Sequence, residues 1–202
     1  MQFRRRAAVM AFQMAVSAST GLLVFNDRAW SYDYIEPDPV GATGGNHFEV
    51  ICPPNTFLLG LRGNTGDQGG IIEKMQLICA PFTPGRPVAD HTNFEVGARF
   101  DQGSWMGAGT GGSFKTTSCT TGTGFVKEIR FNTAVYNNTK LIEHIQLECR
   151  DLADHSSVRV FGYIARGSPH IHTCSGSSFL VGFHGRVGLY LDAIGAVCAG
   201  MP

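Results

Sequence analysis

Apolar and polar residues alternate in the stretches that lead to Cys79, Cys149 and Cys198. The positions two and four residues before these cysteines are apolar, namely Leu77 and Met75, Leu147 and Ile145, and Ala196 and Ile194. The positions between them are polar or small, namely Gln76 and Lys74, Gln146 and His144, and Gly195 and Ala193. A period of two is typical of a β-strand with one buried face. The three cysteines share the apolar face, so we expect them to point toward the core.

Each of these strands closes a segment that begins at another cysteine, so the chain repeats one unit three times. The segments open with CPPNTF at Cys52, CTTGTGF at Cys119 and CSGSSF at Cys174. Similar phrases precede them, namely GATGGNHF from Gly41, GAGTGGSF from Gly107 and a looser FGYIARGSPHI from Phe161. This regularity predicts one supersecondary unit used three times around a shared core, over residues 41–81, 107–151 and 161–200.

The remaining pattern predicts an all-β protein. Beyond the N-terminal stretch, no window has apolar residues at i, i+3, i+4 and i+7 behind a capping residue. Short strands between glycine-marked turns are typical of a barrel, a sandwich or a prism. The threefold repeat favours a prism, because three small sheets that cannot bury their apolar faces alone can pack around one axis. Residues 83–105 interrupt the repeat, and we expect a longer connection and a strand (NFEVGARF) there.

The first 29 residues have the features of a signal peptide. Three arginines at positions 4–6 precede an apolar stretch over residues 7–25, and cleavage points lie near Ala18 and Ala29. A membrane anchor is the alternative, but several polar side chains interrupt the stretch. The sequence therefore predicts removal of residues 1–29 and no membrane insertion of the mature form.

Charge gives no indication of an anionic partner. The chain has 16 basic and 16 acidic residues, so nothing favours nucleic acid or an anionic membrane as a partner. Cleavage after Ala29 leaves a mildly acidic mature protein. Its residues 30–39 are predicted to form an acidic, proline-containing lead-in, and residues 40–202 to form one domain.

The even number of cysteines, two in each repeat, predicts disulfides and an oxidising compartment, so we expect the protein to be secreted or periplasmic. Six cysteines permit 15 pairings. The repeat favours one of them, which is Cys52–Cys79, Cys119–Cys149 and Cys174–Cys198.

The third repeat carries a resemblance to a known family. Its sequence FGYIARGSPHIHTC…FLVGFHGRVGLYLDAIGAVC resembles the C-terminal part of jacalin-related lectins. FVKEIRF…KLIEHIQLEC in the second repeat and GATGGNHF near the N-terminus are similar to further parts of that family, so the resemblance extends over residues 40–199. It implies the β-prism I fold, with three four-stranded Greek-key sheets related by pseudo-threefold symmetry. The cysteine pattern is similar to that of vitelline membrane outer layer proteins, which share the prism.

The resemblance also implies a carbohydrate site. In jacalin-like lectins, a sugar lies between the first glycine-rich turn and a G-x-x-x-D turn near the C-terminus. The matching residues here are Gly44, Gly45, Gly188, Leu189, Tyr190, Leu191 and Asp192. A carboxylate at Asp192 can accept hydrogen bonds from two adjacent sugar hydroxyls, and charge strengthens these bonds. The family often has an aromatic residue at the position of Leu189.

A structural role for the acid is the alternative. Glu73, Glu143 and Asp192 each lie six residues before a closing cysteine, so an acid recurs in every repeat. Such carboxylates often accept backbone N–H groups in tight turns. Glu73 keeps the spacing from a glycine, at Gly69, whereas Thr139 replaces the glycine ahead of Glu143.

Other chemistry has little support in the sequence. His170, His172 and Cys174 lie on one face of a predicted strand and are possible zinc ligands, but the repeat assigns Cys174 to a disulfide. No catalytic motif is present, and we predict no metal, no cofactor and no enzymatic activity.

The sequence therefore predicts a secreted, non-catalytic protein whose partners are glycans or glycoconjugates, and which can form homo-oligomers. The alternative is a structural or protein-interaction module of an extracellular coat or cell envelope.

Overall fold

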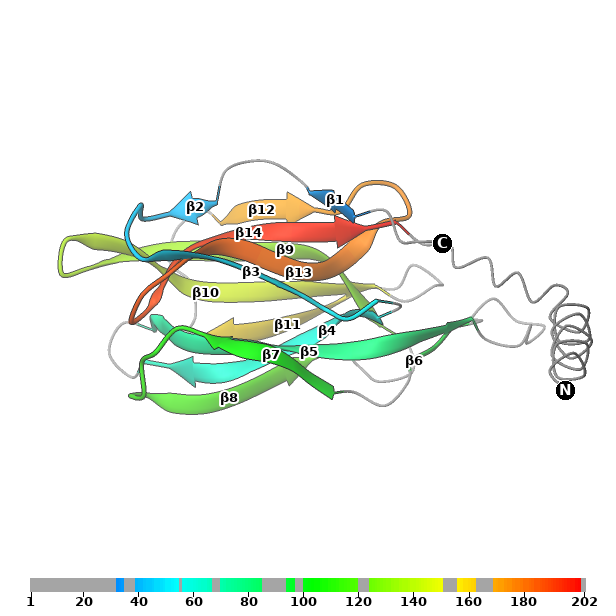
Figure 1. Ribbon diagram of the computed structural model, residues 1–202, viewed down its shortest axis with the longest axis horizontal. Helices are drawn as coiled ribbons and strands as arrows, with labels where there is room; N and C mark the ends of the chain where they lie inside the picture. The colour runs from blue at the N-terminus through cyan, green and yellow to red at the C-terminus, as the bar shows by residue number, and fades with distance from the viewer. Residues whose placement is uncertain are drawn as a thin grey trace, which may run out of the picture.

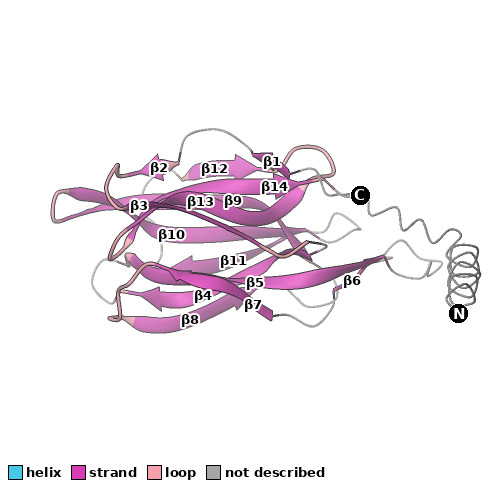
Figure 2. Ribbon diagram, viewed as in Figure 1, coloured by secondary structure: helices cyan, strands magenta, loops and turns pink. Residues whose placement is uncertain are grey.

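The protein is built from strands. The computed structural model describes residues 32–34, 39–54, 56–66, 70–84, 94–96, 100–119, 124–150, 156–162 and 169–200. Every regular element in this part is a β-strand (Figure 2), which confirms the predicted all-β class. The predicted signal peptide lies outside the described residues. Across the ranges just given, no helix is long and apolar enough to cross a membrane.

Three antiparallel hairpins form the centres of three sheets (Figure 1). Sheet 1 is built on β4 (Thr56–Thr65) and β5 (Ile72–Pro84), and sheet 2 on β9 (Phe125–Tyr136) and β10 (Thr139–Arg150). Sheet 3 is built on β13 (Phe179–Val187) and β14 (Leu191–Ala199). Each hairpin belongs to one sequence repeat, so each predicted repeat supplies the central pair of strands of one face of a prism.

The outer strands come from other parts of the chain than the hairpins they flank. In sheet 1, β8 (Ser113–Ser118) pairs with β4, and both β6 (Phe94–Val96) and β7 (Phe100–Met106) pair with β5. In sheet 2, β12 (His170–Thr173) pairs with β9, and β11 (Ser156–Gly162) with β10. In sheet 3, β3 (Asn46–Ile51) pairs with β13, and both β2 (Val40–Gly41) and β1 (Tyr32–Tyr34) with β14.

This pairing places the first two glycine-rich phrases across the ends of hairpins from a different repeat. The phrase that begins at Gly41 connects β2 to β3 and crosses the β13–β14 hairpin, whereas the one that begins at Gly107 connects β7 to β8 and crosses the β4–β5 hairpin. The four-stranded plan is present in all three sheets. Sheets 1 and 3 each have one further short strand, because residues 94–106 form two strands rather than one and the lead-in contributes β1.

Three phenylalanines mark the pseudo-threefold axis. Phe57, Phe125 and Phe179 lie at the start of β4, β9 and β13, in the same position of each repeat. Their ring centroids are 5.8 Å apart for Phe57 and Phe179, 5.9 Å for Phe125 and Phe179, and 6.4 Å for Phe57 and Phe125, all edge-on. Aromatic pairs in this arrangement add to the stabilisation from burial. The three sheets therefore meet around a shared aromatic cluster.

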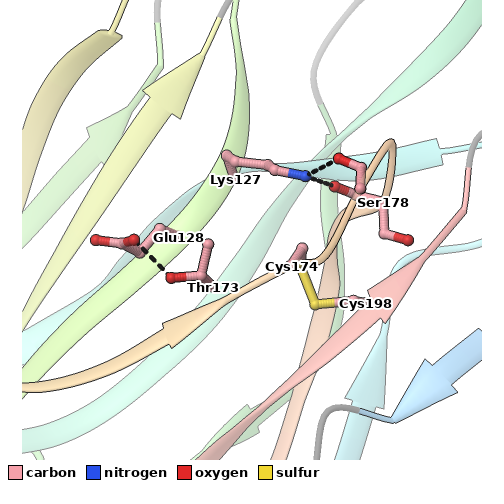
Figure 3. Close-up of a disulfide and its surroundings, with 7 residues drawn as sticks. Lys127, Glu128, Thr173, Cys174, Ser178 and Cys198 are labelled. Carbon is pink, nitrogen blue, oxygen red and sulfur yellow. Dashed lines mark hydrogen bonds between the residues drawn. A yellow bond between two sulfur atoms is a disulfide. The ribbon is translucent and has the colours of Figure 1, made fainter.

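The three predicted disulfides are present. Cys52 bonds to Cys79, Cys119 to Cys149 and Cys174 to Cys198, and all six side chains are buried. Each bond joins the segment before a central hairpin to the second strand of that hairpin. Figure 3 shows the third bond, beside which the Lys127 ammonium of sheet 2 donates hydrogen bonds of 2.6 Å to the Gly176 and Ser178 carbonyls.

Loss of any one disulfide should lower stability by a similar amount. The bonds close segments with sequence separations of 27, 30 and 24 residues, and the chain-entropy model assigns about 3 kcal/mol to a loop of this size. We expect Cys174→Ala/Cys198→Ala to lose about that much free energy of unfolding, measured by denaturant titration. A loss below about 1 kcal/mol would show that the bond adds no constraint to the unfolded chain.

The predicted alternation holds for the apolar face, but the opposite face is less exposed than the pattern indicates. Gln76 and His144 lie on the polar side of the alternation, yet both are buried, and Gln76 accepts a hydrogen bond of 2.9 Å from the Arg62 guanidinium. β14 is buried along its whole length. The His184 ring explains part of this, because a Cβ on Gly195 would lie 2.4 Å from its Nε2 atom. Small residues in β14 let longer neighbours cover it.

Candidate functional site

Each of the three acids occupies a β-bulge. The pairing of β13 with β14 skips Asp192, because Arg186 pairs with Ala193 and Val187 with Leu191. Glu73 in β5 and Glu143 in β10 are skipped in the same way. A bulge bends the strand and re-aims the extra side chain. The bulges explain why an acid recurs six residues before each closing cysteine. The sequence pattern alone does not reveal this cause.

The bulge directs Asp192 under the glycine-rich turn at the N-terminal end of the domain. Asp192 is only 8 % exposed, and its Oδ2 atom is buried without a hydrogen-bond partner among the described residues. Buried polar atoms are normally hydrogen-bonded, so an orphaned carboxylate oxygen needs an explanation. A ligand that donates hydrogen bonds would supply the missing partner.

The turn that covers Asp192 requires glycine. Gly45 has φ +69°, and a Cβ at this position would lie 2.2 Å from Asp192 Oδ2. This distance is shorter than a carbon and an oxygen that are not bonded to each other can reach. Arg186 in β13 holds the turn through hydrogen bonds of 2.8 Å to the Gly44 carbonyl and 2.9 Å to the Gly45 carbonyl. The Ala42 amide donates to the Asp192 carbonyl at 2.8 Å. The structure thus brings the two ends of the domain together, as the resemblance implies.

The β13–β14 connection lies on the other side of the Asp192 carboxylate from the glycine-rich turn. Gly188 lies beside the carboxylate, since a Cβ there would be 3.3 Å from Asp192 Oδ2, and its amide donates a 3.0 Å hydrogen bond to the Tyr190 carbonyl. Leu189 is 65 % exposed at the tip of the connection, whereas Leu191 is buried. Tyr190 packs edge-on against Tyr136, with ring centroids 5.6 Å apart. The seven predicted site residues therefore lie together at one end of sheet 3.

Burial raises the pKa of the Asp192 carboxyl above its ordinary value of 3.8, because desolvation disfavours the charged form. The neighbouring Gly188 amide and the Arg186 guanidinium act in the opposite direction. Ionisation of Asp192 therefore costs stability at neutral pH, and this cost disappears as the pH falls through the raised pKa. An ionised carboxylate held in this position gains from any ligand that donates hydrogen bonds to it.

Sheet 1 repeats this geometry around Glu73. The Glu73 Oε2 atom is buried and lacks a hydrogen-bond partner within the described ranges. The second glycine-rich turn closes over it, since a Cβ on Gly109 would be 3.0 Å from Oε2 and one on Gly111 would be 2.9 Å from Oε1. Asn64 takes the place of Arg186, with its side-chain amide donating to the Gly111 carbonyl at 3.0 Å. Gly69, whose spacing from Glu73 matches that of Gly188 from Asp192, lies outside the described residues, and the glycines seen to close over Glu73 come from the next repeat.

Glu143 lacks such a turn within the described part of the chain. The looser third phrase begins in β11, where a Cβ on Gly162 would lie 2.7 Å from the Glu143 carbonyl, and residues 163–168 of this phrase lie outside the described ranges. Two of the three equivalent acids are thus placed beneath closely packed glycines.

The possible zinc ligands on β12 are accounted for by packing. His170 stacks on Phe131 at 5.5 Å, and His172 meets the same ring edge-on at 5.1 Å. Burial lowers the pKa of His172, with His184 and His170 contributing further. The sulfur of Cys174 is bonded to Cys198. Among the described residues, no three side chains are grouped to hold a metal ion.

A comparison with family models identifies one family. The family model for the jacalin-like lectin domain matches residues 83–197. No curated protein matches the chain by sequence.

Solved structures of lectins share the fold. Malaysian banana lectin has a TM-score of 0.55 at 21 % identity, over 84 % of this chain and 99 % of that one. Calystegia sepium agglutinin has a TM-score of 0.56 at 16 % identity, over 86 % and 98 %. The artocarpin–mannotriose complex has a TM-score of 0.55 at 16 % identity, over 82 % and 97 %. The order and pairing of strands around the glycine-rich turns is therefore that of a β-prism.

Proposed function

Because the chain belongs to the jacalin-like lectin domain family, we propose that it binds carbohydrate and does not transform it. The sugar lies between the Gly44–Gly45 turn and the connection from Gly188 to Asp192. The observation that carries this proposal is the buried Oδ2 atom of Asp192, which has no partner among the described residues and lies between two glycines. Support also comes from structural neighbours that were solved as glycan complexes, including that of artocarpin with mannotriose.

The chemistry of the pocket suits adjacent hydroxyl groups. An ionised carboxylate only accepts hydrogen bonds, and a sugar diol can donate two to it. Hydrogen bonds to a charged group contribute about 1.5–3 kcal/mol each. The exposed Leu189 offers apolar contact to a ring face at the position where the family often has an aromatic residue.

Calorimetric titration with mannose and galactose, preceded by a glycan array, tests the proposal. We expect one of these sugars to bind, and Asp192→Ala to weaken binding by about 100-fold or more, because two charged hydrogen bonds are lost. Binding that is undisturbed by Asp192→Ala would contradict the proposed pocket. If no glycan binds, the protein is better explained as a structural module, and the Asp192, Glu73 and Glu143 variants should then differ only in stability.

Binding should weaken on acidification at a higher pH than an ordinary aspartate would cause. Burial raises the pKa of Asp192 above 3.8, and protonation turns one accepting oxygen into a donor. Titrations between pH 7 and pH 4 should show affinity falling with a midpoint above 3.8. Glu143→Gln serves as the control and should follow the wild-type curve. A flat profile through this range would mean that the Asp192 charge does not take part.

We propose further that the protein is exported. Support comes from the three disulfides, which persist in oxidising compartments, and from the basic and apolar N-terminal stretch. N-terminal sequencing of the mature protein from its native host tests this, and we expect a start close to Ser19 or Trp30.

A further inference from the structure

Aromatic and basic side chains gather on the outer face of sheet 1. Trp105 of β7 and Phe114 of β8 are 40 % and 57 % exposed, and their ring centroids are 6.4 Å apart. The Lys74 ammonium of β5 lies 4.9 Å from the Trp105 ring centroid, and the Arg62 guanidinium of β4 lies 5.6 Å from it. Four strands, which lie in the lower part of Figure 1, thus contribute one side chain each to what we call the Trp105 patch.

The strand register places the patch on the side of the sheet that faces away from the core. Arg62 pairs with Gln76 across β4 and β5, and directly paired residues point to the same side of a sheet. Lys74 shares that side, because it lies two residues from Gln76. Met75, between them, is completely buried. The two basic side chains and the aromatic rings beside them therefore face outward.

The equivalent position in sheet 2 has a different charge environment. Arg130 pairs with the glutamine three residues before the closing cysteine of its repeat, as Arg62 does in sheet 1. Arg130 forms salt bridges of 2.6 Å with Glu128 and 3.1 Å with Glu148. The Nε of Arg62 donates instead to the neutral side chain of Gln76, and its guanidinium lies beside an exposed aromatic ring.

The formal charge of the Trp105 patch is positive. Among the described side chains of β4, β5, β7 and β8, the only acid is Glu73. Its carboxylate lies beneath the second glycine-rich turn, at the end of the sheet. The four residues of the patch itself are two aromatic residues and two cations, so an anionic partner is the one that complements it.

The rings and the charges together fit an acidic sugar. A pyranose ring has an apolar face of C–H groups, which can pack against exposed aromatic rings such as those of Trp105 and Phe114. Lys74 and Arg62 carry N–H groups that can donate to a carboxylate or a sulfate, and charge strengthens these hydrogen bonds. An anion without sugar rings would use only the charges, and a neutral sugar would use only the aromatic rings.

We propose that the Trp105 patch binds an acidic polysaccharide, with a sugar ring on the aromatic side chains and its carboxylate or sulfate group on Lys74 and Arg62. The patch uses no residue of the Asp192 pocket, so this proposal does not depend on sugar binding there. The charge preference is also opposite, because the Asp192 carboxylate repels acidic sugars. One chain can then join a neutral glycan to an acidic polysaccharide.

Titration calorimetry with tetragalacturonate, and in parallel with a heparin tetrasaccharide, tests the patch. We expect at least one of them to bind, and its affinity to fall severalfold between about 50 and 500 mM NaCl, because salt screens exposed charges. Lys74→Gln and Arg62→Gln should each weaken binding by about tenfold, as for one lost hydrogen bond to a charged group. Arg130→Gln is the matched control at the equivalent position of sheet 2 and should bind like the wild type.

Two further ligands separate an acidic sugar from other partners. Fully methyl-esterified tetragalacturonate keeps the rings without the charge, and polyglutamate keeps the charge without the rings. Both should bind at least tenfold more weakly than the acidic oligosaccharide. Trp105→Ala should weaken the acidic oligosaccharide by about tenfold while leaving both cations in place. Asp192→Ala should bind it like the wild type.

Three results would overturn the patch as a site for acidic polysaccharide. These are wild-type protein that binds neither acidic oligosaccharide, polyglutamate that binds as tightly as they do, and Lys74→Gln or Trp105→Ala variants that behave like Arg130→Gln. None of these results affects the Asp192 pocket, which is tested with neutral sugars. Loss of neutral sugar binding in turn leaves the Trp105 patch in place.

Discussion

Gly45→Ala should weaken sugar binding about 100-fold even though it removes none of the predicted ligand side chains. The new Cβ would lie 2.2 Å from Asp192 Oδ2 and 2.6 Å from the Val187 carbonyl carbon, so either the turn or the carboxylate must move. The residue would also have to adopt φ +69°, which costs an alanine about 1 kcal/mol or more. We expect affinity to fall as far as in Asp192→Ala, about 100-fold, measured by calorimetry with the sugar that the wild type binds.

The matched control for this change is Gly176→Ala. Gly176 also has positive φ, at +50°, but a Cβ there has nothing within 4 Å, and its turn lies at the opposite end of sheet 3 (Figure 1). This variant should lose about 1 kcal/mol of stability and bind sugar as the wild type does. If Gly45→Ala binds within threefold of the wild type, the turn does not form the wall of the pocket.

Phe179→Ala should cause the largest loss of stability of the substitutions considered. Its ring is 1 % exposed and contacts both Phe57 and Phe125, so truncation opens a cavity where the three sheets meet. Phenylalanine-to-alanine changes in cores cost about 3–5 kcal/mol. For a chain of this size, that corresponds to a melting temperature lower by on the order of 10 °C. Thermal and denaturant unfolding under oxidising conditions measure both quantities.

Phe114→Ala is the control of the same chemical type. Its ring is 57 % exposed, and its centroid lies 6.4 Å from that of the Trp105 ring. We therefore expect the free energy of unfolding to fall by no more than about 1 kcal/mol. Equal losses in the two variants would contradict a shared aromatic centre. Sugar binding should persist in Phe179→Ala below its melting temperature, because the cluster is not part of the pocket.

Much of the fold was predictable because its signals are local and repeated. Alternation before Cys79, Cys149 and Cys198 indicates strands, and their spacing from three other cysteines indicates the disulfides. Each signal recurs three times, so a chance match in one repeat is corrected by the other two. The family resemblance then predicted that the glycine-rich turn and Asp192 belong to one site, and the structure shows that the two lie side by side.

Other features were not predictable, because they depend on contacts between segments distant in the chain. The acids at positions 73, 143 and 192 look equivalent in the sequence, yet only Asp192 and Glu73 lie beneath closely packed glycine turns in the described structure. Gln76 and His144 lie on the polar side of the alternation, yet both are buried, and Gln76 accepts a hydrogen bond from Arg62. Burial of a polar side chain is set by what packs over it, which alternation does not encode.

By itself, the sequence determined that this protein is made of short strands in three cross-linked repeats, because strand periodicity and cysteine spacing are properties of contiguous residues. Only the tertiary structure decided which glycine turn covers which acid, since outer strands pair with hairpins of another repeat. It also decided that the Leu189 carbonyl and Glu73 lie on either side of Gly109. Residues that far apart in the chain become neighbours only when the three sheets close around their common core.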